Sequence, residues 1–147
     1  MKNVILCLTL ALILLCGAGC ATMSTQAVAL PDLNKQIDNP QMGRIYVIRP
    51  TMYGGALSMQ ITDNGKLIGI TMGNSYLCWE REPGKVEIAA KAENLSVVSL
   101  DVQPAKSYYI CQHVGMGWWT ARNTLELVSE QKGKEFIKEC TPPAYGE

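Results

Sequence analysis

From residue 43 onward, short apolar segments alternate with turn-forming residues, and the turns recur about every ten residues. The turn signals are Asp63-Asn64-Gly65, Gly73-Asn74, Pro83-Gly84, Glu93-Asn94 and Pro104-Ala105. Asp63-Asn64-Gly65 is the clearest of them, because Asn and Gly accept the positive φ angles of tight hairpin turns. Turn signals at this spacing predict consecutive short antiparallel strands in a sandwich or barrel.

The segments between the turns have the apolar content and alternation of strands. In segment 86–92, Val86, Ile88 and Ala90 alternate with Glu87, Ala89 and Lys91, as expected when one face of a sheet is solvated. The expected strands are 44–49, 57–62, 66–71, 76–80, 86–92, 95–102, 108–113 and 120–127. This pattern predicts an all-β fold, an antiparallel β-sandwich of about seven or eight strands.

A different pattern follows the last strand. Ser129 is a good helix N-cap, and the segment 130–139 after it places Phe136 and Ile137 on one side and charged residues elsewhere. We expect a short C-terminal helix here despite Gly133. The tail 141–147 contains Pro142 and Pro143 and is expected to be loose.

The N-terminus has the pattern of a secretory leader. Lys2 supplies positive charge, residues 4–15 form an almost unbroken apolar run, and Cys16-Gly17-Ala18-Gly19-Cys20 follows. The run is too short for a lasting transmembrane helix, which indicates a signal peptide. The small residues before Cys20 resemble the lipobox of bacterial lipoproteins, although Gly17 occupies the place of the usual Leu.

We therefore expect cleavage after residue 19 and lipidation of Cys20, with diacylglycerol on its sulfur and an N-acyl chain. Cys16 is a poorer acceptor, because the bulky Leu15 precedes it. The alternatives are ordinary secretion after cleavage nearby and an uncleaved anchor. No other cofactor is expected. Ala21 is typical of lipoproteins sorted to the outer membrane in diderm bacteria, so the expected location is its periplasmic face. Residues 20–42, with Pro31 and Pro40, are expected to be a flexible tether.

The charge of the chain argues against a nucleic-acid partner. The whole chain has 13 basic and 13 acidic side chains, and loss of Lys2 with the leader leaves 12 and 13, a net charge of −1. A nucleic-acid partner would require a basic face or stripe. We therefore expect no nucleic acid, and a membrane contact made through the lipid.

The order of the motifs resembles a known family. The matching segments are Arg44-Ile45-Tyr46-Val47-Ile48-Arg49-Pro50, Asp63-Asn64-Gly65-Lys66-Leu67-Ile68-Gly69, Gly73-Asn74-Ser75-Tyr76, Glu82-Pro83-Gly84-Lys85 and Lys106-Ser107-Tyr108-Tyr109. With the leader in front, they resemble the small bacterial lipoproteins called domain of unknown function 2846, over residues 43–140. Asp63-Asn64-Gly65 is one residue longer than the family's usual turn. The resemblance implies a transthyretin-like or PEGA-like β-sandwich without catalytic residues.

A search for reactive groups gives little. His113 is the only histidine, and no serine hydrolase, zinc protease, phosphate-binding or Cys-x-x-Cys motif is present. We therefore expect no enzyme activity. Cys111 and His113 lie two apart, on one side of a strand, and can begin a metal site. A third ligand would have to come from Cys78, Cys140 or a carboxylate, so we expect a buried Cys111, a solvated His113 and no metal.

The cysteines leave two arrangements open. Cys78, Cys111 and Cys140 remain in the domain once the sulfur of Cys20 carries lipid. In an oxidising envelope three thiols favour one disulfide, either Cys78–Cys111 or a pair that includes Cys140. Free buried thiols are the alternative, because cysteine packs as a small apolar side chain.

Two loops mix glycine with large apolar side chains. They are Thr51-Met52-Tyr53-Gly54-Gly55-Ala56 and Val114-Gly115-Met116-Gly117-Trp118-Trp119. Met, Tyr and Trp are enriched at protein contacts and membrane interfaces. If the loops share one end of the sandwich, Met52, Tyr53, Met116, Trp118 and Trp119 form an interaction patch for a protein, a glycan or a bilayer. In the alternative arrangement, Trp118 and Trp119 close the end of the core.

The sequence thus favours a membrane-anchored lipoprotein whose non-catalytic β-sandwich binds or supports another envelope component. One alternative is a secreted inhibitor or ligand-binding module that uses residues 116–119. Another is a small metal-site or hydrolytic envelope protein built around Cys111 and His113.

Overall fold

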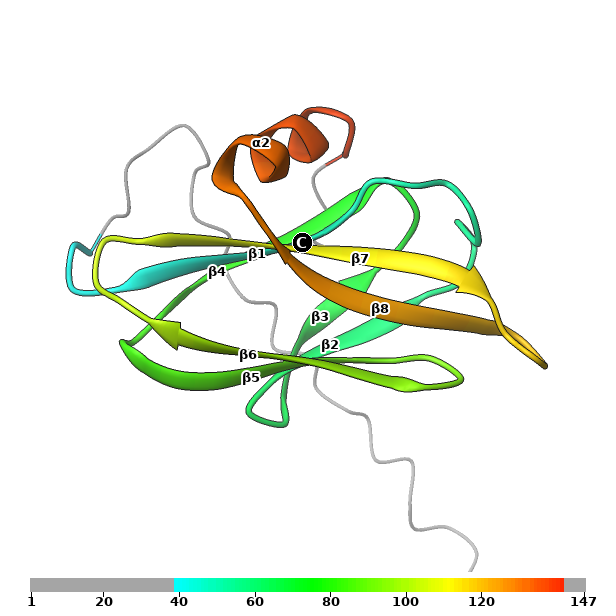
Figure 1. Ribbon diagram of the computed structural model, residues 1–147, viewed down its shortest axis with the longest axis horizontal. Coiled ribbons are helices and arrows are strands. Elements are labelled where there is room, and N and C mark those ends of the chain that lie inside the picture. The colour runs from blue at the N-terminus through cyan, green and yellow to red at the C-terminus, as the bar shows by residue number, and fades with distance from the viewer. Residues whose placement is uncertain (1–38, 142–147) are drawn as a thin grey trace, which may run out of the picture.

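The computed structural model describes residues 39–141. They form two four-stranded sheets with strand orders β4-β1-β7-β8 and β3-β2-β5-β6, and one helix (Figure 1). The elements are β1 (Gly43–Arg49), β2 (Met59–Asp63), β3 (Lys66–Thr71), β4 (Ser75–Arg81), β5 (Gly84–Lys91), β6 (Leu95–Val102), β7 (Ser107–Met116), β8 (Ala121–Val128) and α2 (Glu130–Lys138). The expected signal peptide 1–19, Cys20, most of the tether 20–42 and the tail from residue 142 lie outside the described residues.

The all-β sandwich with a C-terminal helix is confirmed, and the described part of the chain has eight strands. The expected turn residues adopt the expected backbone, with φ of 47° at Asn64 and 80° at Gly65. Ser129 caps α2 and accepts a hydrogen bond from the backbone N–H of Lys132. The strand from Tyr108 is longer than expected, because β7 continues to Met116 and pairs with β8 to that point.

One strand pair departs from the expected antiparallel arrangement. β1 pairs with β4 in antiparallel orientation but with β7 in parallel orientation. Turn signals specify only hairpins between neighbours in sequence, which here are β2–β3, β5–β6 and β7–β8. The other connections pass from one sheet to the other, and β6 returns the chain to the end where β1 starts. β7 therefore runs alongside β1 in the same direction.

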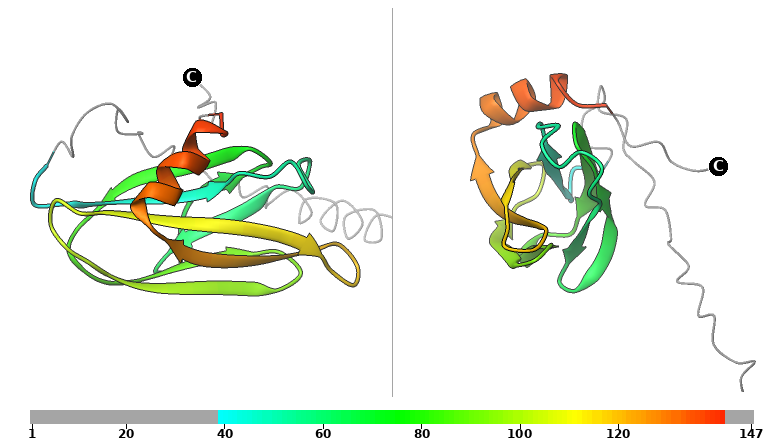
Figure 2. Two further views of the ribbon diagram at one scale, coloured as in Figure 1. Left: turned by 45° about the horizontal axis from the view of Figure 1, so that its top comes forward. Right: turned by 90° about the vertical axis from the view of Figure 1, so that its right-hand side faces the viewer.

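The larger apolar core lies between the two sheets. Its buried members are Ile45, Val47, Ile61, Leu77, Trp79, Val86, Ile88, Ala90, Leu100, Val102, Ile110 and Leu125. A second cluster lies on the outer face of the β4-β1-β7-β8 sheet, where α2 covers it (Figure 2). β1 is buried along its whole length because both of its faces are covered.

The helix lies very close to the sheet beneath it. Tyr46 and Tyr109 stack with ring centroids 4.8 Å apart, and Gly133 packs directly on Tyr109, where a Cβ would collide with the ring. Phe136 and Ile137 add to this cluster, as their spacing predicted. Gly133 is therefore what allows the helix to approach the tyrosines. Within residues 39–141 the structure has no helix long and apolar enough to cross a bilayer.

Candidate functional site

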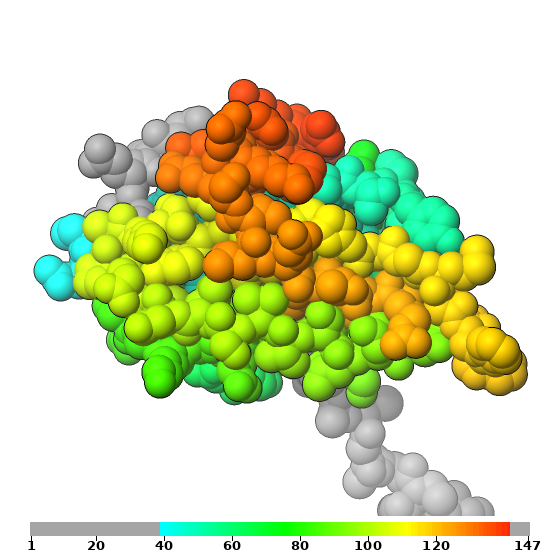
Figure 3. Space-filling view, in the orientation of Figure 1, coloured from blue at the N-terminus to red at the C-terminus, as the bar shows by residue number. Residues whose placement is uncertain are grey.

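The hairpin between β7 and β8 ends in an exposed apolar tip, defined here as residues 116–120. Met116 is 81% exposed, Trp118 84% and Trp119 85%. In the space-filling view the tip projects beyond the rest of the described surface at one end of the molecule (Figure 3). Of the two arrangements considered from sequence, the structure shows the exposed one, and neither indole closes the core.

A carboxylate from the other sheet holds the tip in shape. Glu93, in the turn between β5 and β6, accepts hydrogen bonds from the backbone N–H groups of Trp118, Trp119 and Thr120 at 3.0, 3.0 and 3.1 Å. These bonds, led by that from Thr120, lower the pKa of Glu93 below its ordinary value. Gly117 leaves room for the carboxylate, since a Cβ there would collide with Glu93 Oε2. The sequence pattern marked Glu93-Asn94 only as a turn and did not predict that Glu93 binds the tip.

The base of the hairpin is joined to the same turn. The N–H of Glu93 donates to the carbonyl oxygen of Ala121 at 3.1 Å. Asn94 and Asn123 bond reciprocally: Asn123 N donates to Asn94 Oδ1 and Asn94 Nδ2 donates to Asn123 O, both at 2.8 Å. These bonds join the β5–β6 turn of one sheet to β8 of the other, so the base of the hairpin is fixed to both sheets.

The other expected loop lies at the same end of the sandwich (Figure 1). Met52 and Tyr53 are more than half exposed, and a Cβ on Gly54 would lie 3.4 Å from Val114 Cγ1 of β7. Met72, in the next loop, is also exposed. The five patch residues expected from the sequence therefore share one end, and the structure adds Met72 to them. We call this surface the aromatic end: Met52, Tyr53, Met72, Met116, Trp118 and Trp119.

A buried arginine organises the loop of Met52 and Tyr53. Arg49 is 0% exposed. Its guanidinium donates to Leu57 O at 2.7 Å and to Gly54 O at 2.6 Å, with a longer bond to Thr71 O at 3.4 Å. Burial lowers the pKa of Arg49. The sequence pattern did not predict this role: Arg49 stood only at the end of an expected strand and in a segment that resembles the family.

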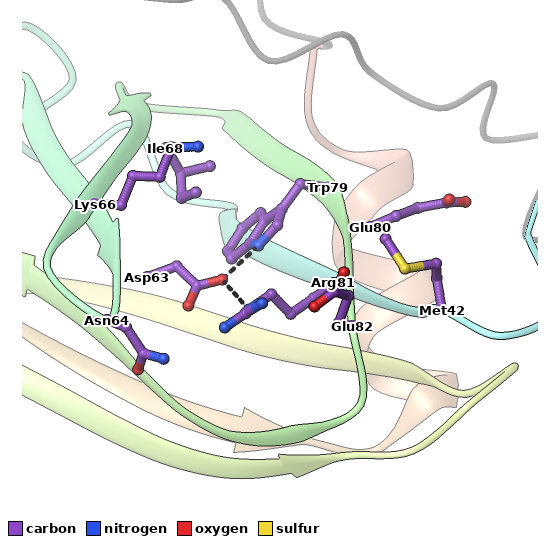
Figure 4. Close-up of a pocket in the computed structure, with 9 residues that line it drawn as sticks. All are labelled: Met42, Asp63, Asn64, Lys66, Ile68, Trp79, Glu80, Arg81 and Glu82. Carbon is purple, nitrogen blue, oxygen red and sulfur yellow. Dashed lines mark hydrogen bonds and ion pairs between the residues drawn. The ribbon is translucent and has the colours of Figure 1, made fainter.

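A pocket of about 510 Å³ lies at the side where β3 and β4 form sheet edges (Figure 4). On its wall Asp63 Oδ2 accepts a hydrogen bond from Trp79 Nε1 at 3.1 Å and forms an ion pair with Arg81 Nε at 3.2 Å. Asp63 is only 6% exposed, so these contacts make it a link between the sheets. Lys66, Glu80 and Glu82 also line the pocket, so its wall carries charges of both signs.

The three cysteines of the domain are free thiols. Cys78 of β4 pairs with Tyr46 of β1, and Cys111 of β7 pairs with Ile48 of β1. The two cysteines therefore lie on strands on opposite sides of β1. The two strands are separated by two strand spacings, about 9.5 Å. This separation exceeds the roughly 7 Å limit between the Cα atoms of a disulfide, so Cys78 and Cys111 are too far apart to form one. Cys140 packs at the edge of the cluster under α2. Burial raises the pKa of Cys78 to about 12 and that of Cys111 and of Cys140 to about 11.

The structure separates the environments of Cys111 and His113. Cys111 is buried, while His113 is exposed and lies 3.0 Å from Glu126, measured from Nε2 to Oε2. Between residues 39 and 141 no group of three His, Cys, Asp or Glu side chains is placed to hold a metal.

Searches with this chain against protein-family models, curated proteins and solved structures found no match. The resemblance to domain of unknown function 2846 stays a prediction.

Proposed function

We propose that this chain is a lipid-anchored, non-catalytic module of the bacterial cell envelope, held through Cys20, which contacts another envelope component through the aromatic end. The leader and Cys20 support the anchor, by their resemblance to a lipobox. The proposed location is the periplasmic face of the outer membrane.

The observation that carries the proposal is the pair of exposed indoles on a tip whose backbone is held by Glu93. Burying an aromatic side chain removes about 150–250 Å² from water, at roughly 25 cal/mol per Å². Two tryptophans thus represent roughly 8–12 kcal/mol of gross binding free energy, before the cost of association. The bracing by Glu93 keeps the backbone of the tip ordered before it binds, so less conformational entropy is lost on contact.

The chemistry of the described reactive groups fits a binding module. The thiols of Cys78 and Cys111 are buried and protonated at neutral pH, and Asp63 is engaged by Trp79 and Arg81. A nucleophile needs a base within hydrogen-bond reach. His113, the one histidine of the chain, lies beside Glu126 on the outer surface.

The anchor is tested by expressing the full chain in a lipidating bacterium and measuring intact mass and membrane fractionation. We expect a mature mass that begins at Cys20 with added acyl groups. Cys20→Ala should block processing or release the protein, whereas the matched variant Cys16→Ala should be lipidated normally. A soluble, unlipidated product from the unmodified chain would contradict the anchor and favour a secreted ligand-binding module.

The contact is tested by photocrosslinking in living cells. A photoreactive amino acid replaces Trp119 in one variant and Leu127 in another, since Leu127 is also exposed but lies towards the other end of β8. We expect adducts to an envelope component from position 119 only, and their loss when Glu93→Gln is added. Equal adducts from both positions, or none from position 119, would contradict a specific contact at the aromatic end.

A further inference from the structure

The tip carries no charge. Residues 114–120 read Val-Gly-Met-Gly-Trp-Trp-Thr, and the side chains of Met116, Trp118 and Trp119 are almost fully exposed. Trp and Tyr concentrate at membrane–water interfaces because each has an apolar body and a polar edge. The side chains of the tip are therefore of the types that favour the boundary between lipid headgroups and acyl chains.

The backbone N–H groups of the tip from Gly117 to Thr120 already have acceptors. The N–H of Gly117 donates to Thr120 O at 3.2 Å, and the next three N–H groups donate to Glu93. Moving an unsatisfied backbone group out of water costs several kcal/mol, which is why open loops avoid the hydrocarbon layer. The tip can leave water without leaving these four donors unpaired.

The same geometry limits how deep the tip can go. Glu93 and Arg122 form the base of the tip: the Glu93 carboxylate is bonded to the backbone of residues 118–120, and Arg122 is close to Gly117. Charged groups are costly within the hydrocarbon layer. Only the side chains beyond this base are suited to enter a bilayer, so the contact is interfacial and shallow.

A protein partner fits the tip less well. Protein interfaces carry about one hydrogen bond per 100–200 Å², and these bonds fix the orientation of the partner. The backbone donors of the tip from Gly117 to Thr120 are already used within the domain, and its side chains offer no charge for an ion pair. A lipid bilayer can bind the tip without directional hydrogen bonds or ion pairs.

The position of the tip is compatible with an anchor in the same bilayer. Residues 39–42 and the tip lie at opposite ends of the sandwich (Figure 1). β7 has 10 residues, which corresponds to a length of about 33 Å. Nineteen peptide steps separate Cys20 from Asn39, and this length of chain spans at most about 65 Å. The chain before Asn39 is thus long enough for the far end of the domain to reach the membrane that holds Cys20.

We infer that the tip inserts Met116, Trp118 and Trp119 into the interface of a lipid bilayer, with Met52, Tyr53 and Met72 resting on the same surface. This inference rests on the proposed function, because it names the partner of the aromatic end. The domain then has two membrane contacts, the lipid on Cys20 and the tip at the opposite end.

The test uses the full-length protein, purified from a lipidating bacterium and mixed with vesicles of phosphatidylethanolamine and phosphatidylglycerol. One set of vesicles carries bromine on the acyl chains, near the headgroups. The chain has three tryptophans, and the buried Trp79 serves as an internal reference. We expect bromine to quench the emission of Trp118 and Trp119. The double variant Trp118→Ala/Trp119→Ala should float with the vesicles and show no quenching, whereas the control Leu127→Ala should behave like the unmodified chain.

Flotation with the vesicles distinguishes a failure of the bilayer contact from a failure of the lipid anchor. Protein that floats while Trp118 and Trp119 are unquenched by bromine and open to aqueous iodide would overturn the bilayer contact and leave the anchor standing. Protein that fails to float, but is quenched by bromine at high lipid concentration, would contradict the anchor and support the tip.

Discussion

The backbone N–H of Trp119 donates to Glu93 Oε2 at 3.0 Å, and this bond joins the β7–β8 hairpin of one sheet to the β5–β6 turn of the other. The hairpin extends beyond the sandwich with both indoles exposed, and without this carboxylate the backbone N–H groups of residues 118–120 would lack an acceptor within the domain. The contact orders an exposed loop, and this order supports the proposed binding role of the aromatic end.

Replacing Glu93 should loosen the tip and leave the core intact. In Glu93→Gln the side chain keeps its size, but it loses its charge, and one of the two oxygens that accept from the N–H groups of residues 118–120 becomes an NH₂ group that cannot accept. Hydrogen exchange should therefore become faster at these three amides, while the unfolding temperature changes little. The control Glu87→Gln alters an exposed side chain of β5 and should leave their exchange unchanged. Unaltered exchange in Glu93→Gln would show that the carboxylate does not order the tip.

Acid should release the tip in the unmodified protein. The pKa of Glu93 is lowered in the folded state, so its carboxylate stabilises the tip fully above the ordinary glutamate value of 4.5. This contribution is lost as the pH falls through the lower, folded-state pKa, where the carboxylate gains a proton. Amide exchange of residues 118–120, corrected for its intrinsic pH dependence, should show protection disappearing below pH 4.5. Protection already lost at a higher pH would contradict the lowered pKa.

Gly133 should not tolerate a methyl group. Alanine is a better helix former than glycine by about 1 kcal/mol, so Gly133→Ala would be stabilising at a solvent-facing position. Here the added Cβ collides with the ring of Tyr109 and forces α2 away from the sheet. We expect a loss of about 1–3 kcal/mol in the free energy of unfolding, measured with urea. The exposed helix variant Glu135→Ala should change it very little, and a stabilised Gly133→Ala would rule out the close contact.

Arg49 should be important for stability because its buried guanidinium holds a loop in place. Arg49→Met keeps an extended side chain but leaves the carbonyl oxygens of Gly54 and Leu57 without their donor. We expect a loss of about 3 kcal/mol in the free energy of unfolding and greater mobility of the loop with Met52 and Tyr53. The exposed control Lys91→Met should be close to neutral. Equal stability of the two variants would refute the organising role of Arg49.

The thiols should be free and slow to react. Cys78 and Cys111 are buried with raised pKa values, so little thiolate is present at pH 8. A thiol reagent should find Cys78, Cys111 and Cys140 in the unfolded lipidated protein, and in the native protein should reach Cys140 first. Fewer than three reactive thiols after unfolding without reductant would reveal a disulfide.

The sequence by itself determined the strands and the local turns. Asn64 and Gly65 take the positive φ that their types allow, Ser129 caps the helix, and the apolar alternation of β5 matches its buried face. These features depend on side chains a few residues apart, so the local pattern contains them. Residue type alone also predicted that Met116, Trp118 and Trp119 belong to an interaction patch.

Only the tertiary structure decided how these pieces meet. The parallel pairing of β1 with β7 joins strands that are far apart in the chain, and no turn between them can specify it. The bond from Trp119 to Glu93 spans 26 residues, and the close approach of Gly133 to Tyr109 depends on where α2 docks. Whether an apolar side chain is buried depends on what packs against it. The exposure of Trp118 and Trp119 was therefore open until the hairpin was seen to extend past the core.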